Sequence, residues 1–385
     1  MMSITFNGYV RPDGRVGIRN YVLILPTILA ASGTCRQIAK QVDGAVSLDN
    51  QVGDELEAED RAQAKRTLVG FGTHPNVAAV LIVGLGIEDL DADELAQEIK
   101  KSGKRVETLV IHEEGGTVKT VEKGVHIATE LNKAADEATR AEVGLDKLVL
   151  GVECGGSDTT SGLAANPAAG VASDLLVEHG GTTFLSETPE MIGAEHILAK
   201  NAVTPEVGQQ ILDMVHNYEE NLKRSGVDFR GAQPSPGNIQ GGLTTIEEKS
   251  LGAIYKSGAA PIKGVLKYAE IPPSPGHYLM DSPGYDIESN TGMIAGGAQV
   301  LIFTTGRGTP VGSPIVPVIK VCGNPKTNQV MADNIDVNAG KIIEGEKTVE
   351  EVGREIFDLI VEVANGKQPK AEQYGFKEFA INRVI

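Results

Sequence analysis

Residues 147–185 read KLVLGVECGGSDTTSGLAANPAAGVASDLLVEHGGTTFL and contain two short apolar runs, 147–152 and 182–185, on either side of an alanine-rich helical stretch. Apolar runs of this length are typical of buried strands. A strand, a helix and a second strand in succession favour a parallel α/β sheet over separate all-α and all-β blocks. This stretch therefore decides the fold class that we predict.

The same alternation extends in both directions along the chain. Further apolar runs of the buried-strand type lie at 21–26, 79–84, 105–111 and 299–303. Helical stretches lie at 91–102, where acids come first and lysines last as the helix dipole prefers, at 119–143 and at 348–365.

The chain is too long for one ordinary core, since 385 residues correspond to two or three domains at ~150 residues each. The long polar helix at 119–143 suits a connector between domains. We therefore expect an α/β protein of two domains, 1–140 and 141–385, with mainly parallel sheets and glycine-rich active-site loops.

The charge balance limits the class of ligand. The chain has 52 acidic and 35 basic residues and a net charge of -17. Such a charge repels phosphate groups, so neither nucleic acid nor an anionic membrane is an expected partner. A small anionic substrate is compatible with it, because a few arginines or lysines in a cleft act at short range.

Three cysteines, Cys35, Cys154 and Cys322, are too few and too scattered for a disulfide framework, which indicates a reducing compartment. Charged residues interrupt the N-terminal segment before any apolar run of signal-peptide length, and no stretch of about 18 apolar residues follows. We expect a cytoplasmic protein.

Common catalytic fingerprints are missing from the sequence. It has no G-x-x-x-x-G-K-[ST], no G-x-G-x-x-G after a strand, no G-x-S-x-G and no H-E-x-x-H. This argues against the common NTPases, NAD-dependent enzymes and hydrolases. Two Pro/Gly-rich stretches without periodicity, 225–242 and 271–284, are typical of binding loops.

An arginine-rich segment, RPDGRVGIRN at 11–20, precedes the apolar run at 21–26. Arg11 and Arg19 are candidates for a fork-shaped carboxylate receptor. The alternative is a solvated turn whose arginines pair with the acidic residues of the protein itself.

A thiol and two carboxylates follow the predicted strand at 147–152, in the segment VECGGSD. Cys154 can supply a soft ligand to a divalent transition metal, and backbone amides next to Ser157 and Asp158 can hold an anionic group. The alternative is a buried, inert cysteine in a tight turn. A second polar segment, SETPEMIGAEH at 186–196, follows the next strand, and two such clusters favour a shared site. His196 alone is more often structural.

Residues 236–249, PGNIQGGLTTIEEK, combine Thr244 and Thr245 as oxyanion donors with Glu247 and Lys249 as acid/base candidates. A capping box between Thr245 and Glu248 is the structural alternative.

Two further candidates for anion recognition lie nearer the C-terminus. Arg307 stands between glycines in TTGRGTP at 304–310, and Lys320 begins the segment KVCGNP. Cys322, in the same segment, is either a metal ligand or a core residue.

Seven ordered segments carry a resemblance to a known family. They are GYVRPDGRVGIRNYVLILP, HPNVAAVLIVGLG, ECGGSDTTSGLAANPAAG, SETPEMIGAEH, SPGNIQGGLTTIEEKSLG, FTTGRGTPVGSPIVP and IKVCGNP. Over nearly its whole length the chain resembles the altronate and galactarate dehydratase family.

The resemblance implies a lyase that depends on a divalent metal, iron(II) before manganese(II), and that dehydrates a sugar acid to a 2-keto-3-deoxy acid. Full-length members of the family also carry a small N-terminal SAF-type domain. This chain begins at the second domain, so the resemblance implies a large subunit with a separate small SAF-domain subunit. A homo-oligomer is also expected.

The resemblance, together with the residue chemistry, assigns a role to each candidate. The metal ligands are Cys154, Glu187 and Cys322. The acid/base residues are His196, Lys249 and Glu247. The substrate-binding residues are Arg11, Arg19, Ser157, Asp158, Thr244, Thr245, Arg307 and Lys320.

Two alternatives remain open from the sequence. The segments GGLTTIEEK, MDS and PVIKVCGNP are similar to the large subunit of sulfolactate sulfo-lyase, which eliminates sulfite instead of water. Many members of the dehydratase family also carry cysteines where this chain reads SLDNQVG at 47–53 and GLGIE at 84–88. Without these cysteines and the SAF domain, a non-catalytic binding subunit is the third reading.

Overall fold

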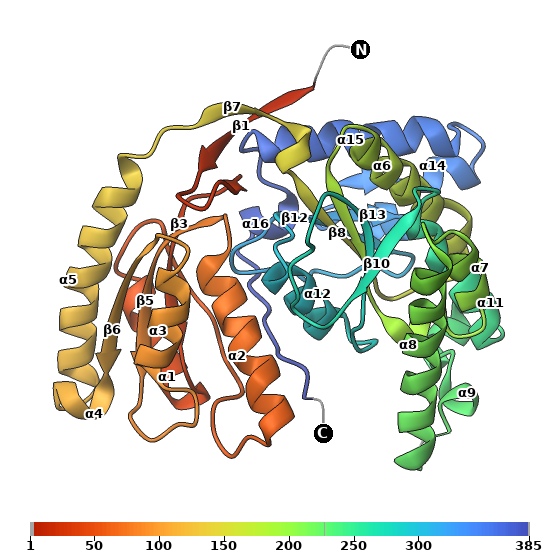
Figure 1. Cartoon of the computed structure of the whole chain (residues 1–385). Coiled ribbons are helices and arrows are strands. Elements are labelled where there is room, and N and C mark those ends of the chain that lie inside the picture. The colour runs from red at the N-terminus through yellow and green to blue at the C-terminus, as the bar shows by residue number, and fades with distance from the viewer. Residues whose placement is uncertain (1–3, 227, 384–385) are drawn as a thin grey trace.

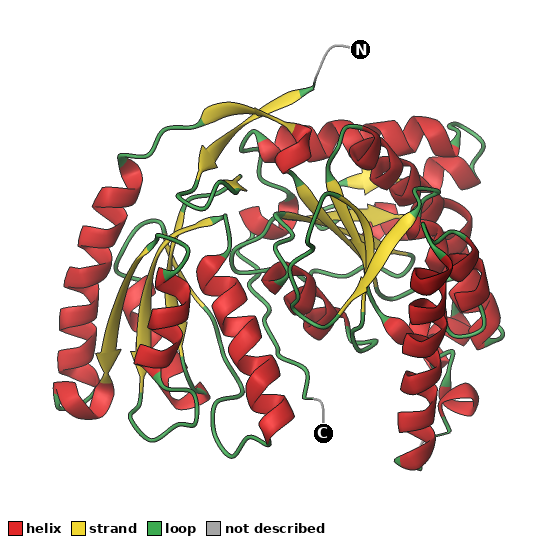
Figure 2. Cartoon of the chain, viewed as in Figure 1, coloured by secondary structure: helices red, strands yellow, loops and turns green. Residues whose placement is uncertain are grey.

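A computed structural model describes residues 4–226 and 228–383, and the fold is built around two parallel sheets (Figure 1, Figure 2). The predicted α/β class with two domains of mainly parallel sheet is therefore confirmed. Among the described residues, no helix combines the length and hydropathy that a membrane span needs.

The first parallel sheet has four strands in the order β4-β3-β5-β6. Its strands are β3 (Tyr21–Pro26), β4 (Ala45–Ser47), β5 (Val77–Gly84) and β6 (Arg105–Val110). Its helices are α1 (Leu29–Ala39), α2 (Ala58–Thr73), α3 (Ala92–Lys100), α4 (Ile111–Glu114) and α5 (Thr117–Asp136). Successive side chains of a strand point to opposite faces. Val22 and Ile24 accordingly pack under α1 and α5, while Leu23 and Leu25 pack under α2 and α3.

The second parallel sheet has seven strands in the order β10-β11-β9-β8-β12-β13-β14. Its strands are β8 (Val149–Cys154), β9 (Thr182–Leu185), β10 (Ile262–Leu266), β11 (Gly276–Met280), β12 (Val300–Thr305), β13 (Val318–Cys322) and β14 (Val337–Asn338). The chain passes from β8 to β9 on one side, and β12 lies on the other. Loops therefore diverge above the end of β8, which is where open α/β sheets bind ligands.

Helices cover both faces of the seven-stranded sheet. They are α6 (Asn166–Glu178), α7 (Glu195–Lys200), α8 (Pro205–Arg224), α9 (Phe229–Ala232), α10 (Pro236–Gln240), α11 (Ile246–Ala253), α12 (Asp286–Ala295), α13 (Pro325–Val330), α14 (Gly340–Ile343), α15 (Val349–Ala364) and α16 (Lys370–Gln373). Short 3-10 turns lie at Leu145–Lys147, Thr188–Met191 and Ile254–Ser257, and a π-helical turn at Ser161–Ala165. Ile302 packs on the α6 and α15 side, and Phe303 on the α12 side.

A small antiparallel sheet joins the two ends of the first domain to the second. Its strands are β1 (Thr5–Val10), β2 (Val16–Gly17) and β7 (Ala141–Gly144), in the order β2-β1-β7. The predicted helix over 119–143 is therefore too long: α5 ends at Asp136, and 141–144 pair with β1. Pairing with a strand more than 130 residues away outweighs the local helical pattern.

The predicted structureless stretch at 271–284 is also wrong in its middle. Residues 276–280 form β11, which lies buried between β10 and β9. Its five residues are too few to show a period, and prolines and glycines on both sides hide it. In contrast, the predicted C-terminal helix is confirmed as α15, which starts with a capping box between Thr348 and Glu351.

The two domains share one apolar core. Phe71 and Leu68 of α2 belong to the same buried cluster as Met293 of α12 and Phe303 of β12. The C-terminal segment runs down between the domains (Figure 1) and adds Phe379, which makes an edge-to-face contact with Phe71 at 5.0 Å between ring centroids. This shared packing fixes the position of the first domain relative to the second.

Candidate active site

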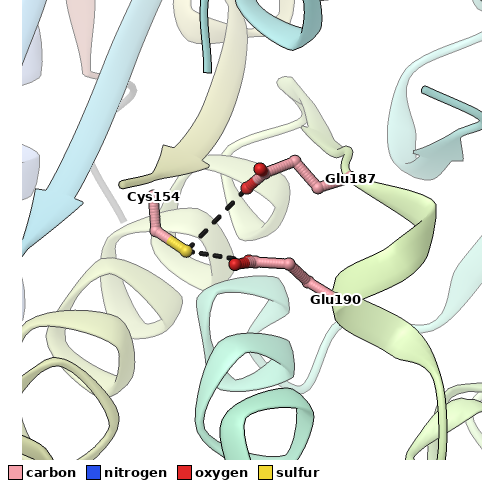
Figure 3. Close-up of side chains that lie close together, drawn as sticks. All are labelled: Cys154, Glu187 and Glu190. Carbon is pink, nitrogen blue, oxygen red and sulfur yellow. Dashed lines mark hydrogen bonds between the residues drawn. The ribbon is translucent and has the colours of Figure 1, made fainter. Parts of the chain in front are cut away.

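The carboxyl ends of β8 and β9 bring a thiol and two carboxylates together (Figure 3). Cys154 is the last residue of β8, and Glu187 and Glu190 lie just after β9. The Cys154 Sγ atom lies 2.8 Å from Glu190 Oε2 and 3.8 Å from Glu187 Oε2. Two of the predicted metal ligands, Cys154 and Glu187, are thus neighbours, and all three side chains are buried.

Glu187 is held in a strained backbone conformation. Its φ of 65° lies in the left-handed region, which few residues other than glycine adopt. Its backbone N–H donates to Ser282 Oγ at 2.7 Å, and its carbonyl accepts from the Glu190 N–H at 2.9 Å. These bonds fix the sharp turn that directs both carboxylates toward Cys154.

Two lysines contact this cluster of Cys154, Glu187 and Glu190. Lys256 Nζ lies 2.6 Å from Cys154 Sγ, 3.0 Å from Glu190 Oε2 and 3.6 Å from Glu187 Oε2, and its side chain is 1% exposed. Lys249 Nζ lies 3.4 Å from Glu190 Oε1, with 18% of its side chain exposed. Lys249 was a predicted acid/base residue, whereas Lys256 was missed. The signal was its spacing: seven residues, or two helical turns, place Lys256 on the same helix face as Lys249.

The lysines decide which acidic groups are charged. Burial works to raise the pKa of Glu190, but Lys256 and Lys249 outweigh it and lower that pKa to about 2. Burial raises the pKa of the Cys154 thiol to about 12, with a further contribution from Glu190. Burial and then the charge of Glu153 raise the pKa of Glu187 well above its usual range. The cluster therefore holds an ionised Glu190 beside groups that keep their protons.

A second group of carboxylates shares Glu187 with the first. Ligand oxygens of Glu153, Glu187 and Asp286 lie within 4.8 Å of one another. Glu153 Oε2 accepts from Ser289 Oγ at 2.6 Å and Ser186 Oγ at 3.1 Å. Glu153 Oε1 is buried, and no N–H or hydroxyl group of the described residues reaches it. Burial raises the pKa of Glu153 to about 7 and that of Asp286 to about 6.

Predicted residues Ser157 and Asp158 organise the loop after Cys154. Ser157 Oγ lies 3.7 Å from Cys154 Sγ. The Asp158 carboxylate accepts from the backbone and hydroxyl of Thr160 and from Asn324 Nδ2 at 2.9 Å. A Cβ on Gly306 would lie 2.0 Å from Asp158 Oδ1, so the glycine allows the β12 loop to close on this carboxylate. Asp158 therefore joins three loops.

Arg307 lies at the edge of the same loops. Its backbone N–H donates to the Gly156 carbonyl at 2.9 Å. Gly156 is two residues after Cys154 in the chain, so this bond holds Arg307 against the loop that follows Cys154. The side chain is exposed, and no ion pair to it occurs among residues 4–226 and 228–383. The exposed guanidinium is therefore available to a substrate carboxylate.

The structure places Arg11 and Arg19 elsewhere, where protein acceptors engage them. Arg11 donates to the carbonyls of Pro75 and Arg19 and to the Asn20 side chain. Arg19 pairs with both carboxylate oxygens of Glu372 at 2.7 Å, and donates to three backbone carbonyls. Both therefore tie the N-terminal segment to the rest of the chain in this structure.

The predicted residues of α7 and α11 are split between the cluster and the surface. Glu247 pairs with Arg230 at 2.5 Å, and His196 is exposed. Thr245 caps α11 by accepting from the Glu248 N–H, while the Glu248 carboxylate returns to Thr244. Of this set, the structure brings only Lys249 to the cluster.

The last two candidates, Lys320 and Cys322, lie on β13. Burial lowers the pKa of Lys320 to about 8, and its ammonium donates to the Val311 carbonyl. Cys322 Sγ lies 3.7 Å from the carbonyl oxygens of Gly306 and Asn324. Cys322 belongs to neither group of possible metal ligands found among the described residues.

Family models match both halves of the chain. Residues 145–385 match the C-terminal domain of D-galactarate/altronate dehydratase, and residues 8–136 match the second domain of D-galactarate dehydratase/altronate hydrolase. The chain belongs to this dehydratase family. The family resemblance predicted from the sequence is thus confirmed.

Curated relatives of the dehydratase family cover nearly all of the chain. The (2R)-sulfolactate sulfo-lyase subunit beta of Chromohalobacter salexigens is 38% identical over 99% of this chain and 97% of its own length. Altronate dehydratase of Bacillus subtilis is 36% identical over 98% of this chain and 77% of its own length. Galactarate dehydratase (L-threo-forming) of Escherichia coli is 36% identical over 96% of this chain and 75% of its own length. The protein is therefore an enzyme, a lyase, and the non-catalytic reading is wrong.

Proposed function

We propose that this lyase removes water from a sugar acid of the altronate or galactarate type and releases a 2-keto-3-deoxy acid. The observation that carries this proposal is Lys249, a partly exposed ammonium group paired with Glu190 at the rim of the buried cluster. An elimination next to a carboxylate needs a group that moves a proton at this kind of position, and the family supports elimination chemistry.

Arg307 binds the substrate carboxylate in this proposal. A guanidinium can hold a carboxylate through two parallel hydrogen bonds, which fixes the orientation of the neighbouring carbon. The backbone contact between Arg307 and Gly156 holds the arginine next to the Cys154 loop. We propose that the carbon next to the carboxylate faces Lys249 in the bound substrate.

Lys249 moves the proton in both halves of the reaction. In its neutral form it takes the proton from the carbon next to the carboxylate, and the electron pair forms an enediolate. The new ammonium group then donates this proton to the departing hydroxyl oxygen. Water leaves, and the remaining enol tautomerises to the 2-keto-3-deoxy acid.

We also propose that the enzyme uses a divalent metal ion, iron(II) or manganese(II). When bound, such an ion supplies Lewis-acid stabilisation of the negative charge. Glu187 would hold it, because this residue is common to both groups of possible ligands. The buried Glu153 Oε1, which lacks a donor among the described residues, supports a cation at this place.

The role of Lys249 predicts the pH dependence of the reaction. Burial opposes the charged form, but Glu190 and Glu187 outweigh it and raise the pKa of Lys249. The neutral form is therefore scarce at neutral pH, and we expect kcat/KM to rise about tenfold per pH unit between about pH 7 and 9. Lys249→Arg keeps the charge but cannot lose its proton in this range, so kcat falls by about 10² or more.

Lys249→Arg can also contradict the proposal. If Lys249→Arg turned over at close to the wild-type rate, Lys249 would be an electrostatic group and another residue would be the base. Lys263→Arg is the control, because Lys263 is exposed on β10 and its ammonium donates to the Pro275 carbonyl.

The substrate is tested by anaerobic incubation with iron(II) or manganese(II) against aldonates, aldarates and sulfolactate. A 2-keto-3-deoxy product is the expected result. The second candidate is elimination of sulfite, favoured by a relative of nearly equal length that is named a sulfo-lyase subunit. Release of sulfite from sulfolactate, without a keto acid from any sugar acid, would establish that reaction instead.

We propose finally that the chain acts together with a small SAF-domain subunit. One relative of nearly equal length is named as subunit beta, and about a quarter of the length of each dehydratase that the chain matches lies outside the match. Co-purification of the chain with a tagged small subunit from the same genome tests this. A chain that elutes alone and turns over fully without it would reject the proposal.

A further inference from the structure

The place that the sequence predicted for a metal already contains a cation. The Lys256 ammonium lies between Cys154, Glu190 and Glu187, at 2.6 Å, 3.0 Å and 3.6 Å from the facing atoms. A metal ion bound to this thiol and these carboxylates would have to occupy the same space. Two cations cannot lie this close in a buried site without strong repulsion.

In the neighbouring group of Glu153, Glu187 and Asp286, Lys256 reaches only the Glu187 carboxylate, at 3.6 Å, and no cationic side chain of the described residues pairs with Glu153 or Asp286. No N–H or hydroxyl group of the described residues reaches Glu153 Oε1, and the Glu187 carboxyl group lies beside it. Only a shared proton or a cation can join two adjacent carboxyl groups. The hydroxyls of Ser186 and Ser289 fix the other oxygen of Glu153, as second-layer donors do for metal ligands.

The backbone of the Cys154 loop is shaped to admit Asp286 to this group. A Cβ on Gly155 would lie 2.1 Å from Asp286 Oδ2. The glycine therefore lets the carboxylate approach the end of β8, where Glu153 also lies. Asp286 is partly exposed, so the group opens toward solvent on this side.

The formal charges of the two groups of side chains together are balanced by a divalent cation. The carboxylates are Glu153, Glu187, Glu190 and Asp286, and the ammonium groups are Lys249 and Lys256. Once a bound metal displaces the protons of these carboxyl groups, four negative charges and two positive charges leave two negative charges, which a divalent cation neutralises. Buried charges need such compensation.

We propose that the divalent cation binds through oxygen atoms alone, at Glu153, Glu187 and Asp286, and that Lys256 takes the place beside Cys154 that a sulfur-bound metal would need. This inference rests on the proposed metal dependence. It narrows the metal to a hard, oxygen-preferring ion such as manganese(II), magnesium(II) or iron(II). It also assigns Lys256 to positioning: the ammonium holds Glu187 and Glu190 at fixed places.

Cobalt(II) distinguishes the two arrangements without any turnover. The full chain, stripped of metal and loaded with cobalt(II), shows a sulfur-to-cobalt charge-transfer band in the near ultraviolet only if a thiolate is a ligand. We expect no such band. A band that disappears in Cys154→Ser would overturn the proposal.

Manganese(II) affinity provides the second measurement. Calorimetric titration of the metal-free chain should give one site, and Glu153→Gln and Asp286→Asn should each weaken it by about tenfold or more. Cys154→Ser and the matched carboxylate control Glu248→Gln, which lies on α11 outside both groups, should leave it unchanged. Circular dichroism melting shows that each variant is folded.

The remaining outcomes are equally decisive. No binding of manganese(II), magnesium(II) or iron(II) by the folded wild-type chain at millimolar metal would mean that a proton joins Glu153 and Glu187, and the inference would fail. Binding as predicted, combined with no product from any substrate of the panel, would reject the proposed dehydration and leave the metal site standing.

Discussion

At the scale of single residues, Lys256 is the group on which the cluster depends most. Its ammonium is the nearest positive charge to Glu190 and lies within 3.6 Å of Glu187. Removing one member of a buried ion pair leaves an uncompensated charge, which typically costs about 3–5 kcal/mol. We expect Lys256→Met to lower the free energy of unfolding by this amount, measured by urea denaturation. The exposed Lys263→Met should change it by no more than ~0.5 kcal/mol, and equal effects of the two would contradict the assigned role.

His277 predicts a pH dependence of stability. Its ring nitrogens lie 2.6 Å from Thr183 Oγ1 and 2.6 Å from Ser257 Oγ, next to Lys256, and burial lowers its pKa to about 4. Between pH 4 and the unfolded pKa of about 6.5 the unfolded chain binds the extra proton. Stability is therefore fully present above about pH 6.5 and is lost as the pH falls toward 4. Denaturation of wild type and His277→Gln at several pH values should show a smaller loss in the variant; parallel curves would contradict this.

At the scale of elements, the site exists because β8 lies between β9 and β12. The three strands end at one edge, and their loops carry Cys154, Glu187 and Arg307 to the same place. The sheet itself is rigid and buried, so precision at the site depends on how closely the loops can approach one another.

Gly155 tests this dependence on close approach. Gly155→Ala would place a Cβ 2.1 Å from Asp286 Oδ2 and 2.8 Å from Phe303 Cζ. Either Asp286 or the β8 loop must move, and a shift of about 1 Å at a catalytic centre costs about 10² in rate. We expect kcat/KM to fall by about this factor while the protein stays folded. Gly33→Ala in α1 meets nothing within 4 Å and is the matched control. Full activity of Gly155→Ala would show that Asp286 is not held by this contact.

At the scale of the whole molecule, the shared core makes the domains one cooperative unit. Phe379 of the C-terminal segment packs on Phe71 of α2 within the cluster that also contains α12 residues. Truncating a buried phenylalanine typically costs about 3–5 kcal/mol. Phe379→Ala should therefore lower the stability of both domains together, in one transition by calorimetry and circular dichroism. Two separated transitions in the wild-type chain would show that the domains unfold independently.

The sequence alone was sufficient for the features that depend on local pattern. The apolar runs at 21–26 and 182–185 coincide with β3 and β9, and the capped helix α15 follows its predicted span closely. Cys154 and Glu187 were found because each follows a buried strand, and parallel strands end at one edge of a sheet. Lys249 was found from its segment and lies at that edge.

Only the tertiary structure decided which side chains meet across long distances in the chain. Lys256 is 102 residues from Cys154 and reaches it because the 3-10 turn at Ile254–Ser257 packs against β8; its spacing from Lys249 does not show that it meets Cys154. The structure likewise engages Arg19 with Glu372, 353 residues away. Local pattern determines strands and helices because the period of the backbone is local. The partner of a charged side chain depends on the packing of distant elements, so the composition of the site was settled by the fold.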